Sequence, residues 1–370
     1  MFFYYIFTAY TIPCIYIYLR INHLLIPNGK KLIFSLFYLL LFIAFPTAEM
    51  LSHNEDNFLS PVIRIGYYTM PFMLYLFLLV FIFDIFLLFN LLFKWLPTGS
   101  LKSTAFCRSG LITAVVGPSL VVLYGIVNFN YIRVSEYNIE VPAESSRLQN
   151  VSVAFISDFH IGDLTSIRFV ERFLSRMKSI DPDIILFGGD LLEGDRDDTR
   201  TSEIESLFRQ LRAPYGIYGV FGNHEHHGGR SSSNFYQNAS IKLLSDTSIL
   251  IDSSFYLVGR KDARNRNRFS IDDITKHLQD HFPILLLDHR PTDISSVSLS
   301  SVNIQLSGHT HHGQLFPFNL ISRDIYEISW GHKKIGNTHF FVTSGIQLWG
   351  PPVRTIGKSE IMLINVKFIQ

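Results

Sequence analysis

The chain has 370 residues, and 48% of them are hydrophobic, with 33 Phe and 17 Tyr, which is unusual for a single domain that is soluble in water. A formal net charge of +1 provides no overall field that favours nucleic acid, so no nucleic-acid partner is expected. The two cysteines, Cys14 and Cys107, are too few for a disulfide framework or a cysteine-rich metal site. Apolar residues dominate 1–130, whereas 133–370 carry nearly all the acidic residues, so two parts are predicted.

Four apolar stretches in the first part are long enough to cross a bilayer, which takes about 20 residues of helix. They are residues 2–19, 32–51, 68–93 and 111–129. The first lacks the basic start and the small-residue cleavage site of a signal peptide, so we interpret it as a span. Asp84 interrupts the third stretch. An acid at that depth usually faces the bundle interior or a polar neighbour, and a proton or ion pathway is the alternative.

Basic residues are concentrated in two of the three connections between these stretches. The first and third connections hold Arg20, Lys30 and Lys31, and Lys94, Lys102 and Arg108 respectively. The second connection, 52–67, offers only Arg64 beside Glu55 and Asp56. Cytoplasmic connections carry the excess of Lys and Arg, which places the first and third of them in the cytoplasm. Both chain ends, and all that follows residue 130, are then predicted to lie on the outer side.

The second part shows alternating strand and helix patterns. Residues 131–150 are predicted to form a linker that becomes an edge strand, and 151–157 a buried strand. Helices are predicted at 169–180 and 202–211, and further strands at 183–187, 216–220, 255–258, 283–287, 302–306, 338–342 and 360–366. This order predicts a mixed two-sheet α/β sandwich. The predicted organisation is a helical transmembrane region at 1–130, the linker and edge strand at 131–150, and an α/β domain at 151–370.

Polar motifs stand where five of these strands end. They are Ser157-Asp158-Phe159-His160, Gly188-Gly189-Asp190, Gly222-Asn223-His224-Glu225, Asp288-His289-Arg290-Pro291 and Gly308-His309-Thr310-His311. Ligands of α/β proteins bind in the crevice beyond the carboxyl ends of strands. Carboxylates, imidazoles and an amide oxygen, without thiolates, suit Mn, Fe or Zn. Taken singly each motif is more often an ordinary turn, but two ions ~3.5–4 Å apart could together hold a phosphate and activate water, which predicts phosphoester hydrolysis.

The order of these motifs over about residues 150–368 resembles the calcineurin-like metallophosphoesterase superfamily. The run Gly-His-Thr-His-His-Gly-Gln at 308–314, with Thr343-Ser344-Gly345, looks like its bacterial membrane-associated branch. The resemblance implies a four-layer α/β/β/α sandwich and a hydrolase of phosphoric ester bonds, with phosphodiesterase activity within its range. Together with the spans, it implies a multi-pass protein of the bacterial cytoplasmic membrane.

The resemblance also implies roles for the motif residues. One divalent metal ion would be held by Asp158, His160, Asp190 and His311, and a second by Asp190, Asn223, His289 and His309. Manganese is expected, with iron or zinc as alternatives. His224 would stabilise the phosphoryl charge and protonate the leaving oxygen. Glu225 would orient the imidazole of His224.

Other conspicuous residues have two interpretations each. His226, His227 and His312 are expected at the solvent-facing rim rather than in a third metal site. The basic run Arg260, Lys261, Arg264, Arg266 and Arg268 predicts a solvated loop, or else a clamp for a second phosphate or an anionic lipid head group. Trp330 and Trp349, with Pro351 and Pro352, suit a substrate mouth or the membrane interface as well as ordinary packing.

The sequence therefore predicts a metal-dependent phosphoesterase acting on phosphate ester or pyrophosphate bonds of a membrane-associated or lipid-linked substrate. One alternative is an enzyme like the UDP-diacylglucosamine pyrophosphatase of lipid A synthesis, although that substrate is cytoplasmic. Another is a transporter or sensor with a regulatory phosphoesterase domain, for which Asp84, within the third span, is thin provision of ionisable residues. The oligomeric state is left open.

Overall fold

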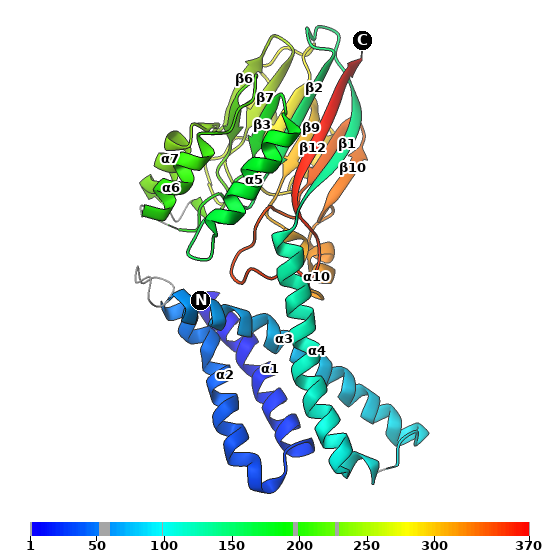
Figure 1. Ribbon diagram of the computed structural model, residues 1–370. Coiled ribbons are helices and arrows are strands. Elements are labelled where there is room, and N and C mark those ends of the chain that lie inside the picture. Colours follow the sequence, from blue (N-terminus) through cyan, green and yellow to red (C-terminus); the bar gives the residue numbers. More distant parts are fainter. Residues whose placement is uncertain (1, 52–59, 98, 195–198, 226–228, 370) are drawn as a thin grey trace. The chain divides into compact units, whose positions relative to one another are not determined.

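The computed structural model describes residues 2–51, 60–97, 99–194, 199–225 and 229–369 (Figure 1). The chain divides into two compact units. The first comprises Met1–Val127 and Gly350–Thr355, and the second comprises Asn128–Trp349 and Ile356–Gln370. Each unit has its own packing, so they are described in turn.

The first unit is built from long helices. They are α1 (Phe2–Leu24), α2 (Lys31–Leu51), α3 (Ser60–Phe93) and α4 (Thr104–Asn130), with short 3-10 turns η1 (Asn28–Lys30) and η3 (Ser100–Lys102). Among the described residues, three segments are long and apolar enough to cross a membrane: Asn28–Leu51, Pro61–Phe93 and Thr104–Asn130. The second, third and fourth predicted stretches thus lie in helices with the length and apolarity of membrane spans, and their crossing stays a prediction. The first stretch also forms a helix, α1, but it carries Arg20 and Asn22, and its crossing stays a prediction.

Asp84 of α3 has polar partners from α1. The Nη2 atom of Arg20 lies 2.5 Å from one carboxylate oxygen of Asp84, and Nε lies 2.6 Å from the other. The hydroxyl of Tyr16 donates to the same carboxylate. The acid is therefore neutralised within the helix bundle, as expected for a polar side chain in an apolar region.

The second unit contains two six-stranded sheets. The first has the order β1-β12-β2-β3-β4-β5 and the second β10-β11-β9-β8-β7-β6. The first sheet comprises β1 (Ile132–Pro142), β2 (Asn150–Ile156), β3 (Ile184–Phe187), β4 (Ile217–Gly219), β5 (Lys242–Leu243) and β12 (Ser359–Ile369). The second comprises β6 (Thr247–Ile251), β7 (Phe255–Gly259), β8 (Ile284–Leu287), β9 (Val302–Ser307), β10 (Gly331–Ile335) and β11 (Thr338–Val342).

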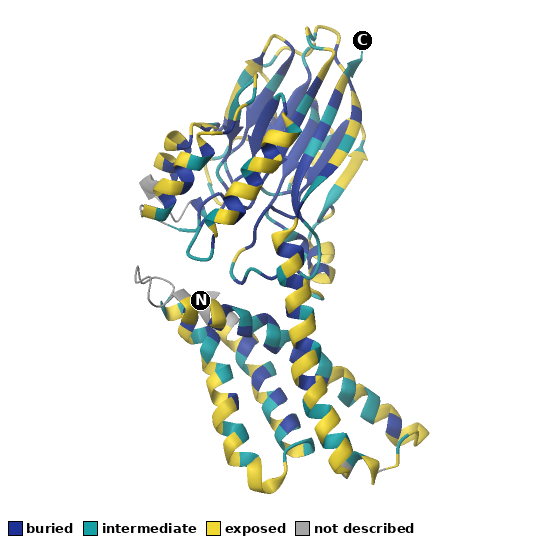
Figure 2. Ribbon diagram, in the orientation of Figure 1, coloured by how far each residue is buried: buried dark blue, intermediate teal, exposed yellow. Residues whose placement is uncertain are grey.

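Helices cover the outer face of each sheet. The first sheet packs against α5 (Ile167–Ile180), α6 (Thr199–Phe208) and α7 (Gly229–Asn238), and the second against α8 (Ile271–Thr275) and α9 (Ile294–Ser298). Side chains alternate along β2, so that Val153 and Phe155 lie between the sheets while Ala154 and Ile156 face the helices. The central strands, such as β3, β8 and β11, are accordingly buried on both faces (Figure 2). This arrangement confirms the predicted four-layer α/β/β/α sandwich.

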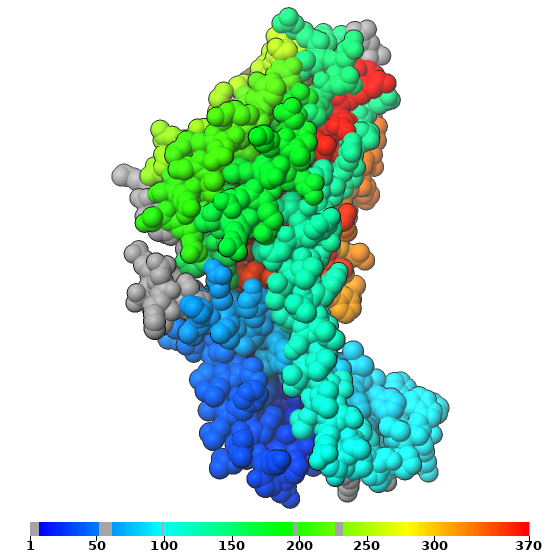
Figure 3. Space-filling view, in the orientation of Figure 1, coloured from blue at the N-terminus to red at the C-terminus, as the bar shows by residue number. Residues whose placement is uncertain are grey.

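The edge strand β1 is joined directly to the preceding helix. It pairs in parallel with β12 along its full length, from Ile132 to Pro142, and the two chain segments lie side by side in Figure 3. The last turn of α4 belongs to the same core, because Phe129 stacks on Phe169 with ring centroids 5.3 Å apart. The end of a candidate membrane span is thus fixed in the second unit.

Candidate metal centre

The predicted acidic and imidazole side chains meet at the carboxyl ends of the strands. They form three groups, and within each group the ligand atoms lie within 4.8 Å of one another. The first group is Asp158, His160 and His311. The second is His160, Asp190 and His224, and the third is Asp190, His289 and His309. Because His160 and Asp190 each belong to two groups, the side chains form one continuous cluster. The loops after β2, β3, β4, β8 and β9 supply them.

The loops at the cluster adopt left-handed backbone conformations that non-glycine residues rarely take. The φ angle is 58° at Asp158, 52° at Asp190 and 70° at His309. Such conformations cost free energy and concentrate at functional sites. Hydrogen bonds between loops hold them, since Asp158 N–H donates to Gly189 O and His160 N–H to Asp190 O, both at 3.0 Å.

Glycine is required where the loops after β3 and β4 touch. A Cβ atom on Gly222 would lie 2.2 Å from Oδ1 of Asp190, closer than any side chain tolerates. The tight approach also lets the N–H of His224 donate to Oδ1 of Asp190 at 2.8 Å. Gly222 therefore lets the backbone N–H of His224 reach the carboxylate of Asp190.

His289 presents its Nε2 atom to Asp190. Its Nδ1 atom donates to the carbonyl of Gly188 at 2.8 Å, which leaves Nε2 facing Oδ2 of Asp190 at 3.1 Å. Burial lowers the pKa of His289, but the negative charge of Asp190 outweighs burial and raises this pKa to about 10. Without metal a proton on Nε2 joins the ring to this carboxylate, and a divalent cation would take the place of that proton. A histidine ligand fixed by its other nitrogen is the usual arrangement at a metal.

The second group of donors converges around His160. Its Nε2 atom lies 3.1 Å from Nε2 of His311, which in turn lies 3.5 Å from Oδ1 of Asp158. Its Nδ1 atom lies 2.7 Å from Oε2 of Glu193. Burial lowers the pKa of His160, but the hydrogen bond and charge of Glu193 outweigh burial and raise it to about 9. The group again gathers nitrogen and oxygen atoms that a divalent ion would satisfy.

Asn223 contributes an oxygen with an open valence. The side chain is 5% exposed, and among the residues described its Oδ1 has no hydrogen-bond partner. A buried acceptor left unsatisfied costs free energy, and an ion is a recurring reason for one. Carboxylate, imidazole and amide donors in this arrangement fit two divalent cations of intermediate hardness.

Glu193 is a site residue that the sequence interpretation missed. Its Oε1 atom lies 2.9 Å from Nδ1 of His224, while Oε2 binds His160. Burial raises the pKa of Glu193, but the hydrogen bonds from His160 and His224 outweigh it and lower this pKa to about 2. The available signal was an acid three residues after Asp190, on the same turn.

The predicted role of Glu225 is wrong. Its buried carboxylate accepts backbone N–H groups instead, from Gly222 at 2.7 Å, Asp190 at 3.0 Å and Leu191 at 2.5 Å. Burial, with the charge of Asp190, raises the pKa of Glu225 to about 7. Glu225 thus fastens the loops after β3 and β4 to each other, and Glu193 takes the position beside His224.

Much of the basic run is internal. Arg260 and Arg268 both pair with the buried Asp288 and with Asp293, at distances of 2.8–3.2 Å, and Lys261 pairs with Asp246 at 3.2 Å. These three residues therefore form ion pairs within the fold rather than a solvated loop or a phosphate clamp. Arg260 and Arg268 anchor the strand end that carries His289.

Arg290 directly follows the proposed ligand His289 in the chain. Its Nε and Nη2 atoms bind the buried carboxylate of Asp262 at 2.9 and 3.3 Å. Its side chain is 21% exposed, and within the described parts of the chain Nη1 has no hydrogen-bond partner. Burial lowers the pKa of His309 to about 3, and the positive charges of His289 and Arg290 add to this effect. Arg290 thus combines a fixed position with open donors.

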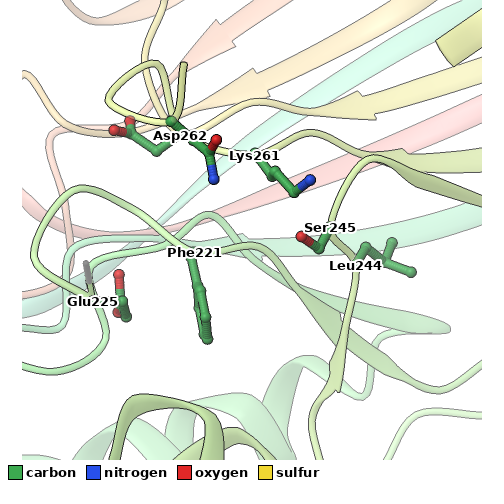
Figure 4. Close-up of a pocket in the computed structure, with 7 residues that line it drawn as sticks. Phe221, Glu225, Leu244, Ser245, Lys261 and Asp262 are labelled. Atoms are coloured by element: carbon green, nitrogen blue, oxygen red, sulfur yellow. The ribbon is translucent and has the colours of Figure 1, made fainter. Parts of the chain in front are cut away.

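A cavity of about 340 Å³ adjoins the loop after β4 (Figure 4). It is lined by Phe221, Glu225, Leu244, Ser245, Lys261, Asp262 and Asn265. Such a volume is within the range of small-molecule sites. Asp262 borders both this cavity and Arg290, so the cavity lies on one flank of the metal centre.

The remaining conspicuous residues are mostly packed. His312 is 2% exposed, with its ring 4.9 Å from that of Trp330, so its predicted place at the solvent-facing rim is wrong. The indole N–H of Trp330 donates to Glu360 at 2.6 Å, which is internal packing. Trp349 is 37% exposed. His226 and His227 lie outside the described residues.

Residues 151–313 of the two-sheet sandwich, which include the His and Asp cluster, match the family model of the calcineurin-like phosphoesterases. The chain thus contains a region of this family, and the relatives that it matches are named metallophosphoesterases. An uncharacterized metallophosphoesterase of Helicobacter pylori is 31% identical over 61% of this chain and 63% of its own length. The chain thus spans less than two thirds of that relative.

Two further relatives extend the comparison. An uncharacterized metallophosphoesterase of Campylobacter jejuni is 26% identical over 90% of this chain and 89% of its own length, so the similarity includes the helical region. A cattle protein (Bos taurus) named transmembrane protein with metallophosphoesterase domain is 26% identical over 60% of this chain and 55% of its own length.

Proposed function

We propose that the chain hydrolyses phosphate ester or pyrophosphate bonds with two bound divalent metal ions. The observation that carries the proposal is the position of Asp190, whose carboxylate lies with His160 and His224 in one group and with His289 and His309 in another. Asp158, His160, Asp190 and His311 would hold one ion, and Asp190, Asn223, His289 and His309 the other. Manganese is the ion proposed, with iron or zinc as alternatives.

When bound, the metal pair supplies Lewis-acid stabilisation of the phosphate oxygens and lowers the pKa of water. The chain's own residues fix the rest of the geometry. Glu193 holds Nδ1 of His224, so Nε2 faces the cluster, 4.0 Å from Oδ2 of Asp190. With 23% of its side chain exposed, His224 is accessible to a substrate and is placed to donate a proton to the leaving oxygen.

Arg290 is proposed to bind an anionic oxygen of the substrate. Asp262 holds two of its nitrogen atoms, and the third, Nη1, keeps donors for a ligand. A guanidinium held in this way loses little freedom when it binds a phosphate oxygen. The cavity bordered by Asp262 is proposed to receive the part of the substrate that lies beyond the phosphate.

A membrane-associated or lipid-linked substrate is the finer part of the proposal. Three helical segments have the length and apolarity of membrane spans, and α4 enters the second unit at its last turn. The distribution of Lys and Arg supports a multi-pass protein of the bacterial cytoplasmic membrane with an extracytoplasmic catalytic unit. A reporter enzyme fused after residue 369 tests this orientation, and activity of a cytoplasmic reporter there would contradict it.

The hydrolase proposal is tested with the full chain in nanodiscs, Mn²⁺, and a series of aryl and alkyl phosphodiesters and phosphomonoesters. His224→Ala should lower kcat by about 10²–10⁴-fold for alkyl esters. Its effect should be smaller for aryl esters, whose leaving oxygen needs no proton. His277→Ala, at an exposed position, is the matched control. A metal-loaded protein that cleaves none of these esters would contradict the hydrolase proposal. An equal loss of kcat for alkyl and aryl esters in His224→Ala would contradict the role of His224 as proton donor.

A further inference from the structure

Helix α10 (Phe318–Ile325) has its polarity reversed relative to an ordinary surface helix. Asn319 and Ser322 are buried, whereas Leu320, Ile321 and Ile325 are 55%, 56% and 66% exposed. A surface helix of a protein in water normally turns its apolar stripe toward the core. The outward apolar face of α10 therefore suits a surrounding that is not water.

The apolar face continues into the turn before the helix. Of the ten exposed large apolar side chains in the described part of 131–370, five lie within ten consecutive positions, which are Phe316, Phe318, Leu320, Ile321 and Ile325. Single exposed apolar residues are normal, but a contiguous group of this size marks an interaction surface. We call these five side chains the α10 face.

The α10 face lies at the end of the second unit where α4 enters. Gln314, just before α10, accepts the N–H of Ile356 at 3.3 Å. The next residue, Gly357, accepts the side-chain amide of Asn128 at 3.3 Å, and Asn128 lies in the last turns of α4. One short segment, 356–357, therefore connects the residue before α10 to Asn128.

The same end of the unit carries the metal centre. The 3-10 turn η5 (His311–Gly313) precedes α10 and contains the proposed ligand His311. Tyr326 directly follows α10, and its ring lies 6.1 Å from that of His309. Whatever binds the α10 face is thereby placed at the rim of the cluster.

We propose that α10 is an interfacial helix that inserts its apolar face into the bilayer crossed by α4. Helices of this kind lie in the membrane plane with the apolar face about 5–10 Å into the boundary between head groups and acyl chains. The metal centre would then stand at head-group level, where it meets the phosphate of a lipid. The membrane contact stands independently, whereas this substrate class rests on the proposed hydrolase function.

The membrane contact is tested by depth measurement on the full chain in nanodiscs of phosphatidylcholine and phosphatidylglycerol, at one protein per disc. An environment-sensitive fluorophore is attached at Ile321→Cys, and at Leu299→Cys as the control, because Leu299 is 89% exposed. Signal from Cys14 and Cys107 in the parent protein is subtracted. Brominated lipids should lower the fluorescence of the probe at position 321 by about twofold or more and leave the fluorescence of the probe at position 299 unchanged.

Two outcomes would overturn the membrane contact. One is equal quenching of both probes by aqueous iodide, which would place position 321 in water. The other is protection from iodide without quenching by brominated lipid, which would mean that protein covers the α10 face. Because the discs hold one chain each, a second copy is excluded as the source of quenching by lipid.

The substrate class is tested with one aryl phosphodiester in two forms, soluble and attached to a diacylglycerol in the disc. Ile321→Glu should lower turnover of the lipid form by about tenfold or more and change turnover of the soluble form less than about twofold. Leu299→Glu should change neither. Equal effects of Ile321→Glu on both forms would overturn the presentation of lipid phosphates. A parent protein that cleaves neither form would refute the proposed hydrolase function, while the depth measurement still decides the membrane contact.

Discussion

The carboxylate of Glu193 lies 2.9 Å from Nδ1 of His224, which turns Nε2 of that ring toward the metal-ligand cluster. The other oxygen of the same carboxylate holds His160 at 2.7 Å. A single acid therefore fixes the proposed proton donor and a proposed metal ligand relative to each other. This coupling makes Glu193 a positioning residue, and its effect on turnover is measured at full metal content.

Glu193→Gln should lower kcat by about 10–100-fold, because an amide cannot accept hydrogen bonds from both imidazoles. KM should change little. Steady-state kinetics with metal content measured on the same samples checks this, and Glu203→Gln, at an exposed position of α6, is the matched control. An unchanged kcat at full metal content would show that His224 needs no such partner.

The motifs predicted the cluster because they mark strand ends, and parallel strands bring their carboxyl ends to one edge. Glu193 escaped prediction because its contact with His224 depends on the packing of separate loops, with Leu192 bridged to Ile161. Glu225 misled because neighbouring residues in a turn point to different sides, and its carboxylate faces the backbone of Gly222. Adjacency in sequence was a poor guide to adjacency in space.

The buried strands were predictable from their apolar runs, but the polar edges of the sheets were not. The strand β10, with the sequence Gly-His-Lys-Lys-Ile, lies at a sheet edge with three exposed residues and so lacks an apolar signal. The two-residue strand β5 is too short for any pattern. The apolar residues of α10 would ordinarily indicate burial, and the fold exposes them instead.

Replacing Arg290 should weaken substrate binding. Arg290→Ala should lower kcat/KM for phosphodiesters by about 10–100-fold, the usual range for a lost hydrogen bond to a charged group. Arg290→Lys should restore part of it, since the charge remains but the fixed fork is lost. Arg266→Ala, at an exposed position of the same region, is the control. Unchanged kcat/KM in Arg290→Ala would remove Arg290 from the substrate site.

Metal affinity should rise with pH. Without metal, the pKa values of His289 and His160 are raised to about 10 and about 9, so both rings are protonated at neutral pH. Stabilisation from these charged rings is fully present below the ordinary pKa of about 6.5 and is lost as pH rises through 9 and 10. Because ligands must lose their protons, Mn²⁺ affinity should increase between about pH 6 and 9, by up to about tenfold per unit for each proton released.

Calorimetric titration of the metal-free protein in buffers of different protonation enthalpy measures that proton release. Glu193→Gln should release fewer protons, because Glu193 raises the pKa of His160. Identical heats of binding in all buffers would mean that no protons are released, and this would contradict the protonation of His289 and His160 in the metal-free protein.

The Arg20 and Asp84 pair should matter for stability and not for catalysis. Asp84→Asn leaves Arg20 without its charged partner and should cost about 1–3 kcal/mol of unfolding free energy. Exchanging the charges, with Arg20→Asp and Asp84→Arg together, should restore part of it. Thermal unfolding of the detergent-solubilised protein measures this, with hydrolysis assayed on the same sample. Loss of hydrolysis by Asp84→Asn at full metal content would favour a working role of the spans.

The central claim is that Asp190 joins two metal ions into one hydrolytic site, and its most direct test compares the full chain with Asp190→Asn. Bound manganese and hydrolysis of an aryl phosphodiester are measured on the same nanodisc samples. The parent protein should bind about two ions and turn over, whereas Asp190→Asn should lose about 10³-fold or more of the activity together with metal occupancy. Turnover by Asp190→Asn at the parent rate, or turnover by the parent protein stripped of metal, would contradict the two-metal account.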